Sequence, residues 1–159
     1  MTEDQAIMCS MAGRVAEEMG SEAGWKRIRT GADSTRYHES GHAVVSRHFG
    51  KKTYCIEIFS NGGRTCYSPN SKSGGSDQEH IALFVDLKNH FGELVDLVEL
   101  ECKTENLLRA NWRAVQRLAE ALEINGGYLN AEQIAEILEK ANREIKPAPG
   151  SKSDEQKHC

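Results

Sequence analysis

Residues 38–42 read His-Glu-Ser-Gly-His, and this spacing constrains the chain more than any other feature. Successive residues of an α-helix are about 100° apart, so His38 and His42 lie almost one above the other. Both imidazoles can then reach one metal ion. Two neutral imidazoles leave Zn²⁺ with its charge and with open positions, which a third protein ligand and a water complete in a catalytic site. Glu39 projects beside the pair, on the flank of the metal.

The residues around the motif predict a helix of ordinary length. Residues 43–45 are Ala-Val-Val, as expected for a helix that is buried along one side. Asp33 or Ser34 can cap its start, and Gly50 can end it. A bound zinc ion lowers the pKa of its water, and Glu39 can take the proton so that the hydroxide attacks a peptide carbonyl. The motif therefore predicts zinc-dependent peptide hydrolysis, against the alternative of a helix with two surface histidines.

Three segments of the chain resemble one protein family. The segment His-Glu-Ser-Gly-His-Ala at residues 38–43 is similar to the His-Glu-Ala-Gly-His-Ala segment of the FtsH-type zinc proteases. Residues 54–58 resemble the strand that follows the zinc helix in that family. Residues 105–134 resemble the helical hairpin that closes its protease domain. The resemblance implies a mostly helical α+β fold, a zincin-like metalloprotease domain with a short β-hairpin and a C-terminal helical hairpin.

The same resemblance implies the third metal ligand. FtsH-type domains supply an aspartate at the start of a helix, after a loop that reads Ser/Thr-Gly-Ala-Ser-Asn-Asp. Residues 73–77 read Ser-Gly-Gly-Ser-Asp, which places Asp77 at that position. Ser76 and Glu79 also have the spacing of a capping box at a helix start. Asp77 is therefore expected to complete the zinc site, although an aspartate in a first helical turn also stabilises the helix dipole without a metal.

Three other acidic residues are candidates for that position. Asp33 lies five positions before His38, about 140° around the helix from it, which suits a helix cap better than a ligand. Glu17 belongs to an Ala-Gly-Arg-Val-Ala-Glu-Glu segment that resembles a helix of the FtsH-type domain, which there follows the zinc helix. If this likeness holds, the helix packs beside the metal, and Glu17 or Glu18 supports a ligand. Asp86 falls inside a predicted amphipathic helix, where solvent-facing acids are common.

Hydrophobic periodicity predicts the remaining elements. Apolar residues recur at helical spacing over residues 3–20, 81–91 and 94–122, and Asn130 is the expected cap of a last helix. Residues 53–67 are rich in β-branched and aromatic side chains around an Asn-Gly-Gly turn, which predicts a β-hairpin. In zinc peptidases of this type an edge strand near the metal can hold the substrate backbone as an added strand.

Length and composition set the class of protein. The 159 residues are expected to form one domain over residues 1–146, followed by a disordered tail over residues 147–159. The net charge of −4 and the lack of a basic cluster argue against a nucleic-acid partner. No apolar run can span a bilayer and no signal peptide is recognisable, so no membrane partner is expected. Five cysteines without a C-x-x-C pair favour reduced thiols in the cytoplasm.

The sequence lacks the G-x-x-x-x-G-K-[ST] motif, whereas FtsH-type proteases join the protease domain to a membrane anchor and an ATPase. Hydrolysis is therefore expected to be independent of ATP and to act on peptides or unfolded protein segments, unless a separate ATPase partner feeds the site. The helical hairpin offers a surface for a homo-oligomer. Two alternatives stay open: a non-catalytic FtsH-like binding or adaptor module that keeps the fold and the metal, and a helical assembly protein in which the motif is accidental.

Overall fold

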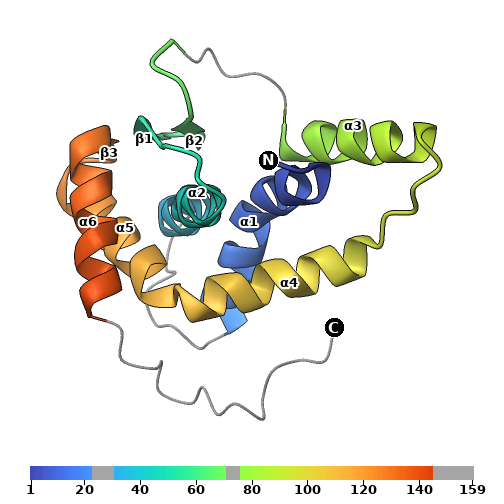
Figure 1. The fold of residues 1–159 in the computed structure, drawn as a ribbon. Helices are drawn as coiled ribbons and strands as arrows, with labels where there is room; N and C mark the ends of the chain where they lie inside the picture. The colour runs from blue at the N-terminus through green and yellow to red at the C-terminus, as the bar shows by residue number, and fades with distance from the viewer. Residues whose placement is uncertain (23–30, 71–75, 145–159) are drawn as a thin grey trace.

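The computed structural model describes residues 1–22, 31–70 and 76–144. These residues form a mostly helical α+β fold, as expected, and it contains a three-stranded antiparallel sheet (Figure 1). None of the described helices is long and apolar enough to cross a bilayer. The predicted tail over residues 147–159 lies outside the described residues. In chain order the elements are α1 (Glu3–Glu22), α2 (Gly31–His48), β1 (Cys55–Phe59), β2 (Gly62–Cys66), α3 (Asp77–His90), α4 (Leu97–Ala110), α5 (Trp112–Ile124), β3 (Tyr128–Asn130) and α6 (Ala131–Arg143).

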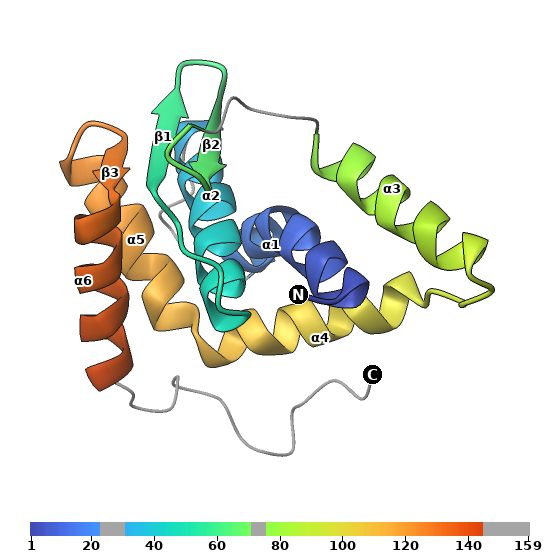
Figure 2. The same ribbon diagram turned by 45° about the horizontal axis from the view of Figure 1, so that its top comes forward.

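Helix α2 carries the His-Glu-Ser-Gly-His motif and lies at the centre of the fold. It contacts α1, α5 and the β1–β2 hairpin, and Figures 1 and 2 show it among these elements. The apolar residues 43–45 are buried, as expected. Tyr37 stacks on Trp112 of α5, with the ring centroids 5.8 Å apart. The chain leaves α2 at Gly50, whose φ of 80° is a conformation that glycine adopts at little cost.

The predicted N-terminal caps of α2 are wrong. The helix begins at Gly31, so Asp33 and Ser34 lie inside its first turns instead of preceding them. A cap accepts a hydrogen bond from a backbone N–H of the first turn, whereas each of these side chains contacts another side chain. Asp33 forms an ion pair with Arg36 on its own helix, and Ser34 donates a hydrogen bond to Glu17 of α1. Both residues therefore hold the start of α2 through side-chain contacts.

Helix α1 packs closely on α2 through small residues. A Cβ at Gly41 would lie 2.6 Å from the carbonyl oxygen of Ala12 and 2.6 Å from Cβ of Ala16. Only glycine permits this approach of one helix backbone to another. The predicted apolar stripe of α1, which includes Ile7 and Val15, is buried on the same side. Because α1 lies so close, its backbone can contact the histidines of α2.

The sheet places an edge strand next to α2. The strand order is β2-β1-β3, and β1 and β2 form the predicted hairpin with Cys55 opposite Cys66. On the other side of β1, Ile56 pairs with Leu129 of β3, and both are fully buried. Strand β3 was not predicted, because three residues are too few to show a strand period. Within the described residues one side of β2 is unpaired, and this strand also contacts α2.

The C-terminal helices confirm one prediction and correct another. Residues 94–122 form two helices instead of one, because the chain breaks at Asn111, whose side-chain amide donates to the carbonyl of Leu107 at 2.8 Å. Asn130 caps α6 as expected, and its side chain accepts a 2.9 Å hydrogen bond from the backbone N–H of Gln133. Helices α5 and α6 pack against each other on the side of α2 away from α3 (Figures 1 and 2).

Helix α3 lies at the outer edge of the fold and packs against α1 (Figures 1 and 2). It starts with the predicted capping box, in which Ser76 and Glu79 exchange hydrogen bonds. None of its residues is buried, and Leu83 is 61% exposed. An ion pair between Lys88 and Asp4 of α1 also connects it to the core, at 2.7 Å. The helix is thus attached by partly buried side chains such as Ile81 and Phe84 and by this ion pair, which matters because it begins with Asp77.

Candidate metal centre

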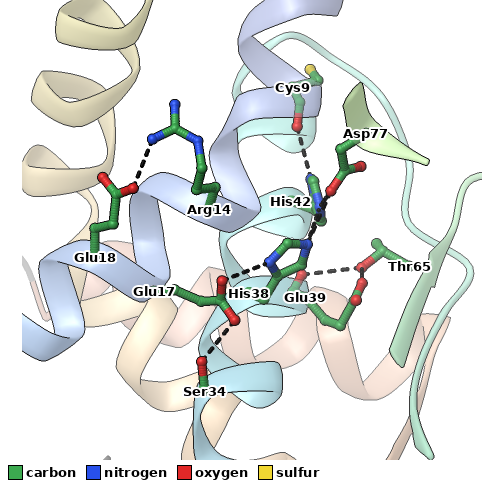
Figure 3. Close-up of polar contacts among 10 residues, drawn as sticks. All are labelled: Cys9, Arg14, Glu17, Glu18, Ser34, His38, Glu39, His42, Thr65 and Asp77. Atoms are coloured by element: carbon green, nitrogen blue, oxygen red, sulfur yellow. Dashed lines mark hydrogen bonds and ion pairs between the residues drawn. The ribbon is translucent and has the colours of Figure 1, made fainter. Parts of the chain in front are cut away.

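Three side chains from two helices converge on one point. Nε2 of His38 and Nε2 of His42 lie 3.0 Å apart, and Oδ2 of Asp77 lies 3.0 Å from the first and 3.1 Å from the second (Figure 3). Bonds of roughly 2.0–2.1 Å to a tetrahedral zinc ion place the ligand atoms about 3.3 Å apart. The triangle is close to that size, and the group can hold a metal ion.

The second ring nitrogen of each histidine contacts an acceptor. Nδ1 of His42 lies 2.8 Å from the backbone carbonyl oxygen of Cys9, which can only accept, so this Nδ1 carries a hydrogen. Nδ1 of His38 lies 3.3 Å from Oε2 of Glu17, whose other oxygen accepts a 2.7 Å hydrogen bond from Ser34 (Figure 3). In the neutral rings both Nε2 atoms therefore present lone pairs to the centre of the triangle. Metal-bound histidines are held by outer partners in this way.

Hydrogen bonds alone do not satisfy this triangle while Nε2 of His42 carries no hydrogen. A proton on Nε2 of His38 can lie toward Asp77 or toward His42, but the remaining contact of 3.1 Å then joins a lone pair of His42 to a carboxylate oxygen. Two acceptors at that distance repel each other. A cation above the centre contacts all three atoms at once, so the donor set fits a metal ion better than it fits a shared proton.

Each of three helices has a separate part in building the centre. Helix α2 places the two histidines on one face, and α3 places Asp77 at its first residue. Helix α1 closes the remaining side with Gly13. A Cβ at Gly13 would lie 2.4 Å from Nε2 of His38 and 2.5 Å from Nε2 of His42. The space between the helices therefore admits a bound ion only if residue 13 has no side chain.

Charges in the centre shift two pKa values in opposite directions. Burial lowers the pKa of His38, but the hydrogen bond to Asp77 and the charges of Glu39 and Glu17 together outweigh it and raise that pKa to about 9. Burial raises the pKa of Asp77, but hydrogen bonds from His38 and His42 and their charges lower it well below its usual value. Without a metal the group is thus a partly buried ion pair, in which an imidazolium occupies the place of a bound cation.

Glu39 is held by the hairpin. Its side chain is buried, with 5% exposure, and its carboxylate Oε2 accepts a 2.6 Å hydrogen bond from the hydroxyl of Thr65 on β2 (Figure 3). The same hydroxyl lies 3.1 Å from the backbone carbonyl oxygen of Glu39. A Cβ at Gly63 would lie 2.8 Å from Cγ of Glu39, so β2 passes directly over the glutamate. The hairpin therefore fixes the orientation of this carboxylate beside the metal group.

A cavity of about 660 Å³ opens over these residues. Its walls come from α1, from α3 and from residues 63–67 at the edge of the sheet, and it includes His38, Glu39, His42 and Asp77. Ligand sites are typically concave and hold a few convergent polar groups, which this cavity does. The predicted base and the three candidate ligands thus share one opening to the surface.

The other acidic candidates lie outside the metal group. Asp33 is paired with Arg36, and Asp86 is exposed on α3. Glu17 contacts the outer nitrogen of His38, so it supports a candidate ligand and is not itself part of the triangle. This agrees with the expectation that the helix around residues 12–18 packs beside the centre. Glu18 instead pairs with Arg14 at 2.7 Å on the surface of α1.

Three contributors to the centre were missed at the sequence level. The carbonyl of Cys9 has no signature in the sequence, because every residue has one. Thr65 is recognisable only once the packing of β2 on α2 brings it to Glu39. Gly13 had a visible signal, since a glycine inside an apolar helical stripe costs helix stability and usually has a packing reason.

No protein-family model, curated protein or solved structure matches the chain. The zincin-like fold and the relationship to FtsH-type proteases therefore stay predictions, based on the segments quoted from the sequence. The chemistry of the centre is inferred from its own residues.

Proposed function

We propose that the protein is a zinc-dependent endopeptidase, with His38, His42 and Asp77 as metal ligands and Glu39 as the general base. The observation that carries this proposal is the convergence of two Nε2 atoms and one carboxylate oxygen within 3.0–3.1 Å of one another, with both Nδ1 atoms held by acceptors. Two nitrogens and one oxygen suit zinc and leave a tetrahedral ion one position for water. When bound, the ion would acidify that water and polarise a carbonyl.

Glu39 supplies the proton transfers in this proposal. It follows His38 directly and lines the same cavity. Thr65 occupies its Oε2 oxygen, which leaves Oε1 for a water molecule in the cavity. The carboxylate accepts a proton from the water and later gives it to the leaving amine. Because Thr65 holds the group in place, little reorientation is needed before each transfer.

The edge strand supports an extended peptide as the substrate. Residues 63–67 of the β2 side line the cavity, and within the described residues the outer edge of β2 is unpaired. An extended chain can add to such an edge through its backbone and so bring a carbonyl to the centre. Folded proteins do not offer an extended segment, so peptides and unfolded segments are the substrates, and no step requires ATP. The position of residues 12–18 beside the centre supports the proposed relationship to FtsH-type proteases.

Zinc content and peptide cleavage, measured together on four proteins, test this proposal. Wild type, Glu39→Gln and Asp33→Ala are expected to bind one zinc per chain, and Asp77→Ala is expected to bind little. Cleavage of an unstructured peptide is expected in wild type and in Asp33→Ala, which serves as the matched control because it removes a carboxylate outside the triangle. A wild-type protein that takes up no zinc would overturn the proposal.

A second function, a non-catalytic module that keeps the metal and binds peptides, is favoured by one observation. Glu39 is only 5% exposed, and its carboxylate is already bonded to Thr65, as in a purely structural contact. The same set of proteins separates the two functions. Zinc-loaded wild type that binds the peptide as tightly as Glu39→Gln but does not cleave it would support the binding module.

A further inference from the structure

We propose that Lys51 binds a carboxylate of the substrate and so makes the protein selective for acidic peptides. The inference rests on the proposed function, since it takes the cavity beside the metal group as the peptide site. Lys51 lines this cavity together with His38, His42 and Asp77. It comes three residues after the end of α2, so it lies close in the sequence to the helix that carries the two histidines.

The backbone and the side chain of Lys51 are both held in place. After the turn at Gly50, the N–H of Lys51 donates to the carbonyl of Ser46 at 2.9 Å. Its Nζ lies 4.1 Å from the centre of the Tyr67 ring. The hydroxyls of Tyr67 and Ser46 are 3.1 Å apart, and Ser46 is one helical turn after His42. The ammonium group therefore lies against a ring that is hydrogen-bonded to the helix of the two histidines.

Within residues 1–22, 31–70 and 76–144, the charge of Lys51 has no neutralising partner. Among the described residues no carboxylate lies within ion-pair distance of its ammonium group. Arg64, the other Lys or Arg on the described wall, is paired with Glu57 and lies over the ring of Phe59. A lysine on an aromatic face still has donors for an anion, and a carboxylate is the anion that peptides contain. Glu3, at the start of α1, is an acid on the same wall.

Two groups of a peptide have this chemistry: the side chain of Asp or Glu, and the C-terminal α-carboxylate. In both cases a carboxylate oxygen accepts a charge-assisted hydrogen bond from Nζ. With the acidic side chain, Lys51 selects the residue near the scissile bond. With the α-carboxylate, it selects the distance of the cut from the end of the peptide.

The test uses peptides that differ only in charge. Glu, Gln or Lys is placed in turn at each position around the cleaved bond, with a free or an amidated C-terminus. kcat/KM is measured for wild type, Lys51→Glu, Lys51→Met and Lys52→Glu, each loaded with zinc. Lys52→Glu is the matched control, because it changes the charge of the neighbouring residue by the same amount. Lys52 lies over the ring of Tyr54 and does not line the cavity. Binding of the same peptides to the Glu39→Gln protein, with Lys51 intact and with Lys51→Met added, is measured by fluorescence anisotropy, which does not depend on cleavage.

Wild type and Lys52→Glu are expected to prefer the carboxylate-bearing peptide by about tenfold, at one Glu position or at the free C-terminus. Lys51→Met is expected to lose the preference, and Lys51→Glu to reverse it toward Lys. An unchanged preference in both Lys51 variants overturns the proposal, as does equal binding of Glu and Gln peptides with either terminus. If binding shows the preference but no peptide is cleaved, the peptidase function fails while the role of Lys51 is retained.

Discussion

Nδ1 of His42 lies 2.8 Å from the carbonyl oxygen of Cys9, so a backbone group of α1 orients a candidate ligand on α2. Cys9 and Gly13 are one helical turn apart. The same turn of α1 therefore supplies both the acceptor that fixes the histidine and the gap in which an ion fits. The arrangement of the two histidines therefore depends on the contact between α1 and α2.

Gly13→Ala is expected to weaken zinc binding by about ten- to hundredfold, because the new Cβ lies 2.4–2.5 Å from both Nε2 atoms. Helix propensity alone predicts that the same substitution stabilises the helix, since alanine is more favourable than glycine by about 1 kcal/mol in a helix. Competition with a chromogenic chelator measures the affinity. Ser21→Ala, near the exposed end of α1, is the control, and equal zinc affinity in both variants would contradict this account of the site.

Glu17→Gln is expected to lower zinc affinity by roughly tenfold or more without unfolding the protein. The carboxylate at 3.3 Å orients His38 and makes its ring a better ligand, and outer partners of this kind typically contribute ten- to hundredfold. Glu18→Gln removes a neighbouring charge that faces Arg14 and serves as the control. Matching zinc affinities for the two variants would show that Glu17 only bonds Ser34.

Thr65→Val is expected to lower kcat by about tenfold and to leave zinc content unchanged, because it removes the 2.6 Å hydrogen bond that orients Glu39. Thr65→Ser keeps the hydroxyl and is expected to restore most of the rate. Steady-state kinetics on one fluorogenic peptide separates kcat from KM. A change confined to KM would assign Thr65 to peptide binding.

Zinc binding is expected to release a proton at neutral pH. The pKa of His38 is raised to about 9, so the metal-free ring is protonated at pH 7 and must lose that proton before Nε2 can bind zinc. Apparent zinc affinity therefore rises about tenfold per pH unit until the pH reaches that pKa.

The stability of the metal-free chain depends on pH in the opposite direction from zinc affinity. The raised pKa of His38 stabilises the fold fully below pH 6.5, and this contribution is lost as the pH rises through about 9. Calorimetry of zinc binding in buffers of different protonation enthalpy gives the number of protons released per zinc bound. A number near zero would contradict a charged His38 in the metal-free chain.

Periodicity and capping chemistry were sufficient to predict most of the helices. The stripe over residues 3–20 became α1, and the capping boxes at Ser76 and Asn130 are present. Both signals are local, so a single sequence contains them. The break at Asn111 was not predicted, because the apolar pattern continues through it.

The candidate site was predictable in part for the same reason. The spacing of His38 and His42 is local and fixes their common face. Asp77 is far from them in the sequence, and its place beside them was expected only from a resemblance. The start of α2 was misplaced, because Asp33 and Ser34 have the chemistry of caps, yet their side chains bond to Arg36 and Glu17. Contacts between elements, such as Thr65 with Glu39, have no signal in the order of residues.

Helix α3 has no buried residue, yet it supplies one of the three converging side chains. An ion bound there would act as a cross-link between residues 42 and 77. It would hold the start of α3 on α2, where the hydrophobic core holds α3 only weakly. Removal of the ion by a chelator would then make local opening of α3 easier, and would do so far more for α3 than for α2. Limited proteolysis of the metal-free chain would cut first within residues 77–96, and added zinc would protect that segment.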